Sequence, residues 1–204
     1  MVLRWILSRV RRPHPIVVVS GLPRSGTSMM MRMLQLGGMD VACDNFRKKD
    51  EDNPRGYFEL ERVKSLKGDA DKSWIGETPR KAVKVISFLL SDLPDEFNYK
   101  IIFVHRHIDE ILASQSRMLE RRSETNKTSD EDMKSAYAAH LKDVESFLKS
   151  KPNFDSFDVQ YDHVIRDPET HAKKINEFLG GALDVSSMTA AVEPDLYRNR
   201  ITSS

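Results

Sequence analysis

The sequence predicts an α/β fold with a central, mainly parallel sheet flanked by helices, and three observations support this class. Residues 16–20 (IVVVS) form an unbroken apolar, β-branched run, which is typical of a strand buried on both faces of a parallel sheet. A glycine-containing turn and a helical stretch that stops at Gly37 and Gly38 follow directly, as in a strand–helix unit. Two further apolar runs, residues 99–105 and 157–161, alternate with helical segments, as the strands of a parallel sheet do.

Four more helices are expected between and after these strands. Thr78 and Pro79 suit the N-cap and first position of a helix over residues 78–93. Apolar residues recur at helical spacing over residues 129–149, where Ser129 and Asp132 give an N-terminal signal. The other two helices run through Ile111, Leu112, Ser114 and Met118, and from Asp167 and Pro168 to Gly180 and Gly181.

The length and charge of the chain bound its organisation. Its 204 residues suit one domain over residues 1–204, with a basic N-terminal arm (1–14) and a helical elaboration (120–151). The net charge is +1, so no global excess of charge favours nucleic acid, and we expect no nucleic-acid partner. Any anion site must therefore be built locally. The charged stretch over residues 40–55 is expected to be mostly solvated loop, with a short strand before Asp44.

The single cysteine and the N-terminal segment bear on location. Cys43 alone excludes intrachain disulfides and cysteine-cluster metal sites, and it fits a reducing cytoplasm. No apolar run approaches the roughly 20 residues of a membrane span. Residues 1–12 are basic and apolar, but Arg4 and Arg9 interrupt them, which makes a poor signal peptide. Two interpretations stay open for this segment: a frayed or docked terminal turn, or a basic amphipathic helix in weak contact with a membrane surface.

A turn suited to phosphate binding lies between the first strand and its helix. Residues 21–28 read GLPRSGTS, and backbone N–H groups at such a helix start can hold an anion. Thr27 stands where the loop of a nucleoside triphosphatase, G-x-x-x-x-G-K-[ST], carries lysine, and Arg24 is the only cation within the turn. The strand over residues 99–105 is followed by Arg106, not by an Asp that would help to hold Mg²⁺. The turn therefore predicts a phosphate site of a different class.

This turn resembles the 5′-phosphosulfate loop of the sulfotransferases, which bind 3′-phosphoadenosine 5′-phosphosulfate (PAPS). The family has Lys or Arg at the position of Arg24, and Ser or Thr after the glycine. By this resemblance Arg24, Ser25, Gly26, Thr27 and Ser28 hold the 5′-phosphosulfate. The resemblance also implies a P-loop fold, sulfuryl transfer to a hydroxyl or amine acceptor, and no metal.

A second stretch, FVHRHIDEILASQ, resembles the family's signature for the 3′-phosphate. It has Arg106 at the strand end and Ser114 eight positions on, about two turns into the next helix. LYRNR near the C-terminus is similar to basic segments that cover the nucleotide in relatives, which implies a role for Arg198 or Arg200. The resemblance extends over residues 16–200. The acceptor-side segments match no pattern, so a small molecule, a glycan and a lipid stay open as acceptors.

The chemistry of sulfuryl transfer gives these residues roles. The planar fork of Arg24 suits the leaving 5′-phosphate, because it can bind two oxygens at once. Lys84 in KAVKV resembles a segment that lies near the phosphosulfate in relatives, although a helix-surface lysine is an equal alternative. Arg106 has the alternative of a structural ion pair with Asp109 or Glu110.

A general base would assist a hydroxyl acceptor. Strand alternation directs His105 and His107 away from the side of Arg106, which favours packing roles for both histidines. Acidic candidates are Glu59, Asp44 and Glu61, with Glu59 preferred because Gly56, Tyr57 and Phe58 supply a setting that could raise a carboxylate pKa.

Two other functions compete with the sulfotransferase. One is a nucleotide-binding protein of the same fold without catalysis, which the short chain and the unassigned base leave open. The other is a P-loop kinase, which would need ATP, Mg²⁺ and the missing loop lysine.

Overall fold

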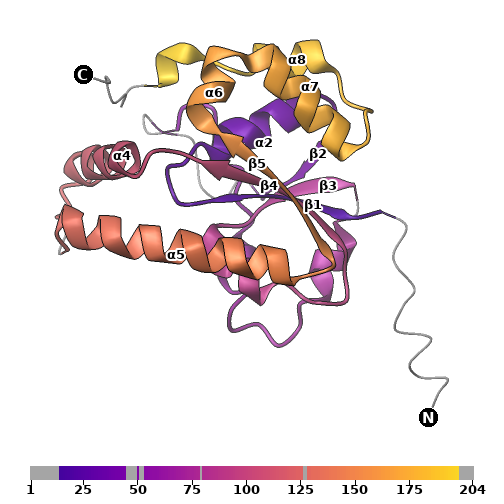
Figure 1. Cartoon of the computed structure of the whole chain (residues 1–204), viewed down its shortest axis with the longest axis horizontal. Coiled ribbons are helices and arrows are strands. Elements are labelled where there is room, and N and C mark those ends of the chain that lie inside the picture. Colours follow the sequence, from indigo (N-terminus) through magenta and orange to yellow (C-terminus); the bar gives the residue numbers. More distant parts are fainter. Residues whose placement is uncertain (1–13, 45–49, 51–52, 79, 126–127, 198–204) are drawn as a thin grey trace.

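The computed structural model describes residues 14–44, 50, 53–78, 80–125 and 128–197. Within these residues the chain forms a parallel sheet with strand order β2-β3-β1-β4-β5 (Figure 1). The strands are β1 (Ile16–Gly21), β2 (Asp40–Ala42), β3 (Lys81–Lys84), β4 (Tyr99–His105) and β5 (Phe154–Gln160).

Helices cover both faces of this sheet (Figure 1). One face packs against α2 (Thr27–Leu36), α6 (Tyr161–Arg166), α7 (Pro168–Leu179) and α8 (Val185–Ala190). The other packs against α5 (Asp130–Ser150) and the short 3₁₀ helices Ser73–Glu77 and Ser87–Asp92. α3 (Glu61–Lys64), α4 (Ile108–Arg121) and the 3₁₀ turn Pro194–Leu196 complete the described elements.

The alternation of side chains along β1 explains the two layers. Val17 and Val19 are buried in the core beneath α2, whereas Ile16 and Val18 are buried in the core beneath α5. Each successive side chain of a strand points to the opposite face, so a continuous apolar run supplies both cores. The prediction of a strand buried on both faces is confirmed.

Most of the other predicted elements are confirmed as well. β4 has the predicted bounds, and α2, α4, α5 and α7 occur where apolar spacing placed them. Ser129 caps α5, where its Oγ accepts a hydrogen bond from Asp132 N at 3.1 Å. Asp167 caps α7 through Thr170 N at 3.1 Å. β5 begins three residues earlier than expected, and Tyr161 starts α6 instead of ending the strand.

The predicted helix over residues 78–93 is wrong. Thr78 closes a 3₁₀ turn, because its Oγ1 donates to Ile75 O at 2.6 Å, and Arg80 has a left-handed backbone with φ of 66°. β3 follows, paired with β1 on one side and β2 on the other. Ala82 and Val83 are fully buried on opposite faces of the sheet. The strand pairing overrides the local cap signal at this position.

Candidate functional site

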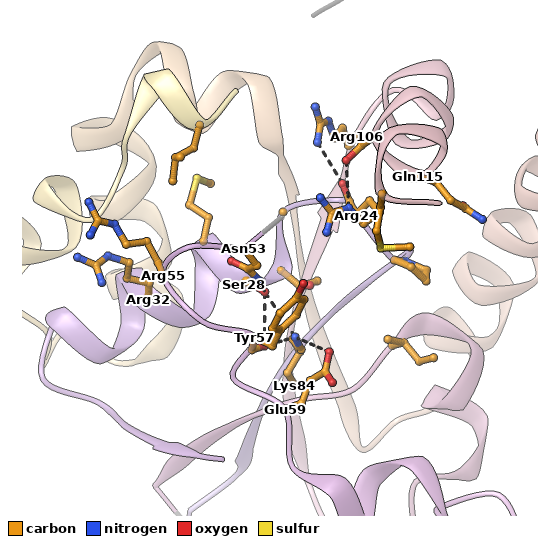
Figure 2. Close-up of a pocket in the computed structure, with 18 of the residues that line it drawn as sticks. Arg24, Ser28, Arg32, Asn53, Arg55, Tyr57, Glu59, Lys84, Arg106 and Gln115 are labelled. Carbon is orange, nitrogen blue, oxygen red and sulfur yellow. Dashed lines mark hydrogen bonds and ion pairs between the residues drawn. The ribbon is translucent and has the colours of Figure 1, made fainter. Parts of the chain in front are cut away.

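A cavity of about 530 Å³ opens where the strands of the sheet end (Figure 2). Its walls come from the turn after β1, the loop before α3, the end of β3, and one face of α4. In open parallel sheets, ligands bind outside the carboxyl ends of the strands. The cavity therefore lies where the fold is expected to place a ligand.

The turn after β1 presents backbone amides to this cavity. Arg24 and Gly26 both have left-handed backbones, with φ of 70° and 107°. α2 starts at Thr27, and no side chain caps its N-terminus. The first amides of a helix lack intrahelical partners, and the helix dipole makes this end attractive to anions. The predicted turn thus has the conformation of an anion site.

Gly26 has a second reason to be glycine. A Cβ at this position would lie 2.3 Å from the ring of Tyr161, the first residue of α6. The tyrosine therefore packs directly on the backbone of the turn. Ser25 is fully buried, and its Oγ has no hydrogen-bond partner within the described residues, whereas Thr27 and Ser28 line the cavity.

The two predicted phosphate motifs meet in space. Arg24 Nε donates to Ser114 Oγ at 3.0 Å, across 90 residues of sequence. Arg106 Nη1 donates to the carbonyl oxygen of Arg24 at 3.1 Å (Figure 2). All three side chains line the cavity. One polar cluster therefore joins the turn after β1 to the start of α4.

Arg106 is held by a buried carboxylate and two aromatic rings. Its Nε lies 2.9 Å from Glu110 Oε2, and the side chains of Arg106 and Glu110 are only 8% and 6% exposed. Its guanidinium lies 4.7 Å from the ring centre of Tyr161 and 5.2 Å from that of Tyr197. Tyr197 donates to the other oxygen of Glu110 at 2.6 Å. Burial, followed by the hydrogen bond and charge of Glu110, raises the pKa of Tyr197, so the phenol keeps its proton as a donor.

A third polar group surrounds Lys84 at the end of β3. Lys84 Nζ donates to Tyr57 O and lies 3.5 Å from Ser28 Oγ and 3.6 Å from Glu59 Oε1 (Figure 2). Its side chain is 7% exposed. Asn53 Nδ2 also donates to Ser28 Oγ, at 2.8 Å. The alternative of a helix-surface lysine is wrong, because Lys84 lies in a strand and reaches the phosphate turn.

Of the three acidic candidates for the general base, only one lines the cavity. Glu59 lines the cavity beside Lys84. Asp44 does not line it, and its Oδ2 accepts a hydrogen bond from Glu61 N at 2.6 Å, which fixes the start of α3. Glu61 pairs with Lys64 at 2.7 Å. The geometry therefore favours Glu59 over Asp44 and Glu61 as a group that could reach an acceptor.

The histidines next to Arg106 have structural partners. His105 Nε2 lies 2.7 Å from Asp158 Oδ1, and this hydrogen bond lowers the pKa of Asp158. His107 lies 3.5 Å from Asp109. Neither histidine lines the cavity. The ring of His105 packs against that of Phe103, as predicted, whereas the His107 side chain is 60% exposed, so the packing role predicted for His107 is wrong.

Some predictions lie outside the described residues. These are Arg198 and Arg200 at the C-terminus and the interpretations of residues 1–12. Within the described ranges, no helix is long and apolar enough to cross a membrane. In the same ranges, His, Cys, Asp and Glu side chains form no group of three or more that could hold a metal ion.

Sequence reasoning missed several residues of the site. Tyr161 and Tyr197 flank Arg106, and Asn53 contacts Ser28. Arg55, which lines the cavity, pairs with Glu193 at 2.7 and 2.8 Å. Of these residues, only Tyr161 could have been found from the sequence pattern. It directly follows β5, and a side chain at the carboxyl end of a parallel strand lies at the edge of the sheet where ligands bind. The other contacts depend on loops whose path the sequence pattern does not specify.

Comparisons with known proteins agree with this geometry. A model of the sulfotransferase family matches residues 56–184, more than half of the chain. This match includes Glu59, Lys84, Arg106 and Ser114 but begins after the phosphate turn. No curated protein sequence matches the chain.

Three solved sulfotransferase structures share the fold. Mouse sulfotransferase SULT7A1, complexed with PAP, superimposes with a TM-score of 0.54 at 17% identity, over 93% of this chain and 66% of that one. Sulfotransferase STF1 from Mycobacterium tuberculosis gives 0.53 at 15% identity, over 93% and 73% of the two chains. A sulfotransferase from Alicyclobacillus acidocaldarius gives 0.50 at 16% identity, over 89% and 87%. The present chain thus spans about two thirds of the mouse protein, and the match of the family model shows that it belongs to the sulfotransferase family.

Proposed function

We propose that this chain binds PAPS and transfers its sulfuryl group to a hydroxyl or amine acceptor. The observation that carries the proposal is the contact between the two phosphate motifs. Arg24 bonds to Ser114, and Arg106 bonds to the backbone of Arg24, so two anion-binding groups face one cavity. A donor with phosphates at both its 3′ and 5′ positions matches this pair, and the mouse relative was solved with PAP.

The residues present fit such a donor. The uncapped start of α2 and the Arg24 side chain suit a 5′-phosphosulfate, since both bind an anion through several N–H groups. Arg106 and Ser114 suit a 3′-phosphate. The rings of Tyr161 and Tyr197 hold the Arg106 guanidinium in place for this contact.

The mechanism follows from where charge develops. The donor supplies a sulfuryl group whose bond to the 5′-phosphate oxygen breaks as an acceptor oxygen or nitrogen bonds to sulfur, and the electron pair leaves with the 5′-phosphate. Arg24 and the turn amides stabilise that leaving oxygen, which is preorganised electrostatic catalysis. Lys84, buried beside Ser28, supports the same charge from the end of β3. Glu59 accepts the proton of the acceptor, within reach of Lys84.

Comparing nucleotides by thermal stability tests the donor. At a concentration of about 100 Kd a ligand adds roughly 2.7 kcal/mol, which raises the Tm of a domain of this size by about 5 to 10 °C. We expect adenosine 3′,5′-bisphosphate to reach this range and ADP, ATP and ATP with Mg²⁺ to give clearly less. Arg106→Ala should remove the advantage of the bisphosphate, and Arg166→Ala, an exposed arginine on α6 paired with Asp162, should keep it. Equal stabilisation by ATP that depends on Mg²⁺ would favour a kinase and refute the proposal.

A further inference from the structure

One face of α4 lines the cavity well beyond the donor motifs. Four residues of α4 and its C-cap residue recur at spacings of three and four, and all five line the cavity: Ser114, Arg117, Met118, Arg121 and Arg122. Residues at these spacings share one face of a helix. With a rise of about 1.5 Å per residue, this face extends roughly 10 Å from Ser114 to Arg121. The cavity therefore continues past the donor groups along a basic face of the helix.

The charge of the cavity is strongly one-sided. Among the described residues that line it, nine are Lys or Arg and two are Glu. Both glutamates lie beside cations at the turn end, Glu59 at Lys84 and Glu193 at Arg55. The chain as a whole has a net charge of only +1, so this concentration of positive charge is local.

The donor motifs use only part of this charge. Arg24, Lys84 and Arg106 belong to the proposed donor groups. Arg117 and Arg121 lie further along α4, Arg122 directly follows it, and Lys64 ends α3. Among these outer cations, Lys64 pairs with Glu61 at 2.7 Å, and Arg122 lies 3.9 Å from Asp50. Neither partner lines the cavity, so the lining itself stays positive at this end.

The cavity also has an apolar wall. Its side chains come from the segment around α3, from the stretch after β3, and from α4 and α5: Leu60, Val63, Ile86, Leu89, Met118 and Tyr137. Ile86 is 37% exposed although it is a large apolar residue. A basic rim over an apolar wall binds a molecule that has both an anionic group and an apolar part.

We infer that the acceptor is an anionic amphiphile: an apolar or aromatic molecule that carries a carboxylate or sulfate besides the hydroxyl or amine to be modified. This inference rests on the proposed function, because it takes the turn end of the cavity as the donor site. The anionic group binds Arg117 and Arg121, the apolar part lies on the wall, and the acceptor group points toward Glu59 and the phosphate turn.

Two fluorescent probes test the inference without knowledge of the natural acceptor. 8-Anilinonaphthalene-1-sulfonate is an anionic amphiphile, and N-phenyl-1-naphthylamine is a close analogue without the sulfonate. Both are titrated into protein saturated with adenosine 3′,5′-bisphosphate. In the double variant Arg117→Gln/Arg121→Gln we expect the sulfonate probe to bind about tenfold more weakly, because it loses its contacts with two exposed charges. The uncharged probe should bind unchanged.

A matched control removes the same charge elsewhere. Lys142→Gln/Lys174→Gln changes exposed residues of α5 and α7 that do not line the cavity, and both probes should bind it as they bind the parent protein. In the parent protein, affinity for the sulfonate probe should also fall between about 50 mM and 500 mM salt, because screening weakens exposed charge contacts.

The outcomes separate this inference from the proposed function. If the bisphosphate binds but the sulfonate probe does not bind, or binds the double variant as tightly as the parent, the inference is wrong and the proposed function stands. If the double variant loses bisphosphate affinity by the same factor, these arginines serve the donor, and the inference is again wrong. If the parent protein does not bind the bisphosphate, the proposed function fails and the inference fails with it.

Discussion

The buried carboxylate of Glu110 gives a sharp test of the 3′-phosphate site. Glu110 accepts from Arg106 Nε at 2.9 Å and from Tyr197 OH at 2.6 Å, and its side chain is 6% exposed. Glu110→Gln keeps the shape of the side chain and its hydrogen-bonding capacity. The glutamine oxygen can accept from Arg106, and its amide can donate to the Tyr197 hydroxyl. The substitution therefore removes charge and leaves the geometry.

The loss of charge should lower stability by a definite amount. A hydrogen bond to a charged group contributes about 1.5 to 3 kcal/mol, and a neutral one about 0.5 to 1.5. The bond with Tyr197 becomes a neutral one, and the bond with Arg106 keeps only the charge of the arginine, so we expect the free energy of unfolding to fall by roughly 2 to 3 kcal/mol. For a chain of this length that corresponds to a fall in Tm of about 5 to 10 °C. Complete removal of one partner from a buried pair costs more, about 3 to 5 kcal/mol.

Glu110→Gln should increase the affinity for the bisphosphate although it lowers stability. An anion on the far side of the Arg106 guanidinium would lie about 7 to 8 Å from the Glu110 carboxylate, and at an effective dielectric of about 20 their repulsion is roughly 2 kcal/mol. Glu110→Gln removes this repulsion, so adenosine 3′,5′-bisphosphate should bind about 5- to 30-fold more tightly. AMP, which has no 3′-phosphate, should bind the variant and the parent with similar affinity.

Titration calorimetry with the two nucleotides and a denaturant melt measure these effects. Glu169→Gln is the control, because it breaks an exposed pair with Lys173 on α7 and should change stability by less than about 0.5 kcal/mol. If the bisphosphate gains no more affinity than AMP, Arg106 does not bind the 3′-phosphate. If stability is unchanged, the pair with Glu110 does not have the energetic role assigned to it.

Three other predictions concern the base, metal dependence and the phosphate turn. Glu59→Gln should lower kcat about 100-fold or more, the usual scale for a general base, with little change in nucleotide affinity. Asp44→Asn should mainly destabilise the start of α3. If steady-state assays show the larger fall in kcat for Asp44→Asn, Asp44 is the base. Sulfuryl transfer should survive EDTA, and activity that disappears and returns with a divalent ion would contradict a metal-free mechanism. Gly26→Ala should weaken bisphosphate binding at least tenfold, because its Cβ would lie 2.3 Å from the Tyr161 ring at a φ of 107°; unchanged binding by calorimetry would show that the turn does not contact the nucleotide.

The sequence pattern predicted the parts of the fold that local chemistry controls. Residues 16–20 and 99–105 are apolar enough to be buried on both faces, and Ser129 and Asp167 cap their helices through short-range hydrogen bonds. The error over residues 78–93 has the opposite origin. There a good local cap signal competed with pairing to β1 and β2, and the long-range pairing decided the structure.

Some residues of the candidate site could likewise be predicted from local sequence, and others could not. Arg24, Arg106 and Ser114 could be predicted from the sequence because each lies at a fixed offset from a strand end or a helix start. The contacts of Asn53 and Tyr197 could not be predicted, because each side chain reaches the site from a loop or 3₁₀ turn whose path depends on packing. Lys84 was found by resemblance but assigned to the wrong element, and its burial in β3 explains how it reaches Ser28.

Transfer of a labelled sulfuryl group tests the central claim most directly. The protein is incubated with PAPS labelled with ³⁵S at sulfur and a panel of hydroxyl and amine acceptors that includes anionic amphiphiles, and labelled product is separated and counted. We expect transfer to at least one acceptor, with stoichiometric release of adenosine 3′,5′-bisphosphate, and a large fall in kcat for Arg24→Ala. Tight binding of the bisphosphate without transfer to any acceptor would contradict the claim and identify the chain as a nucleotide-binding member of the family without catalysis.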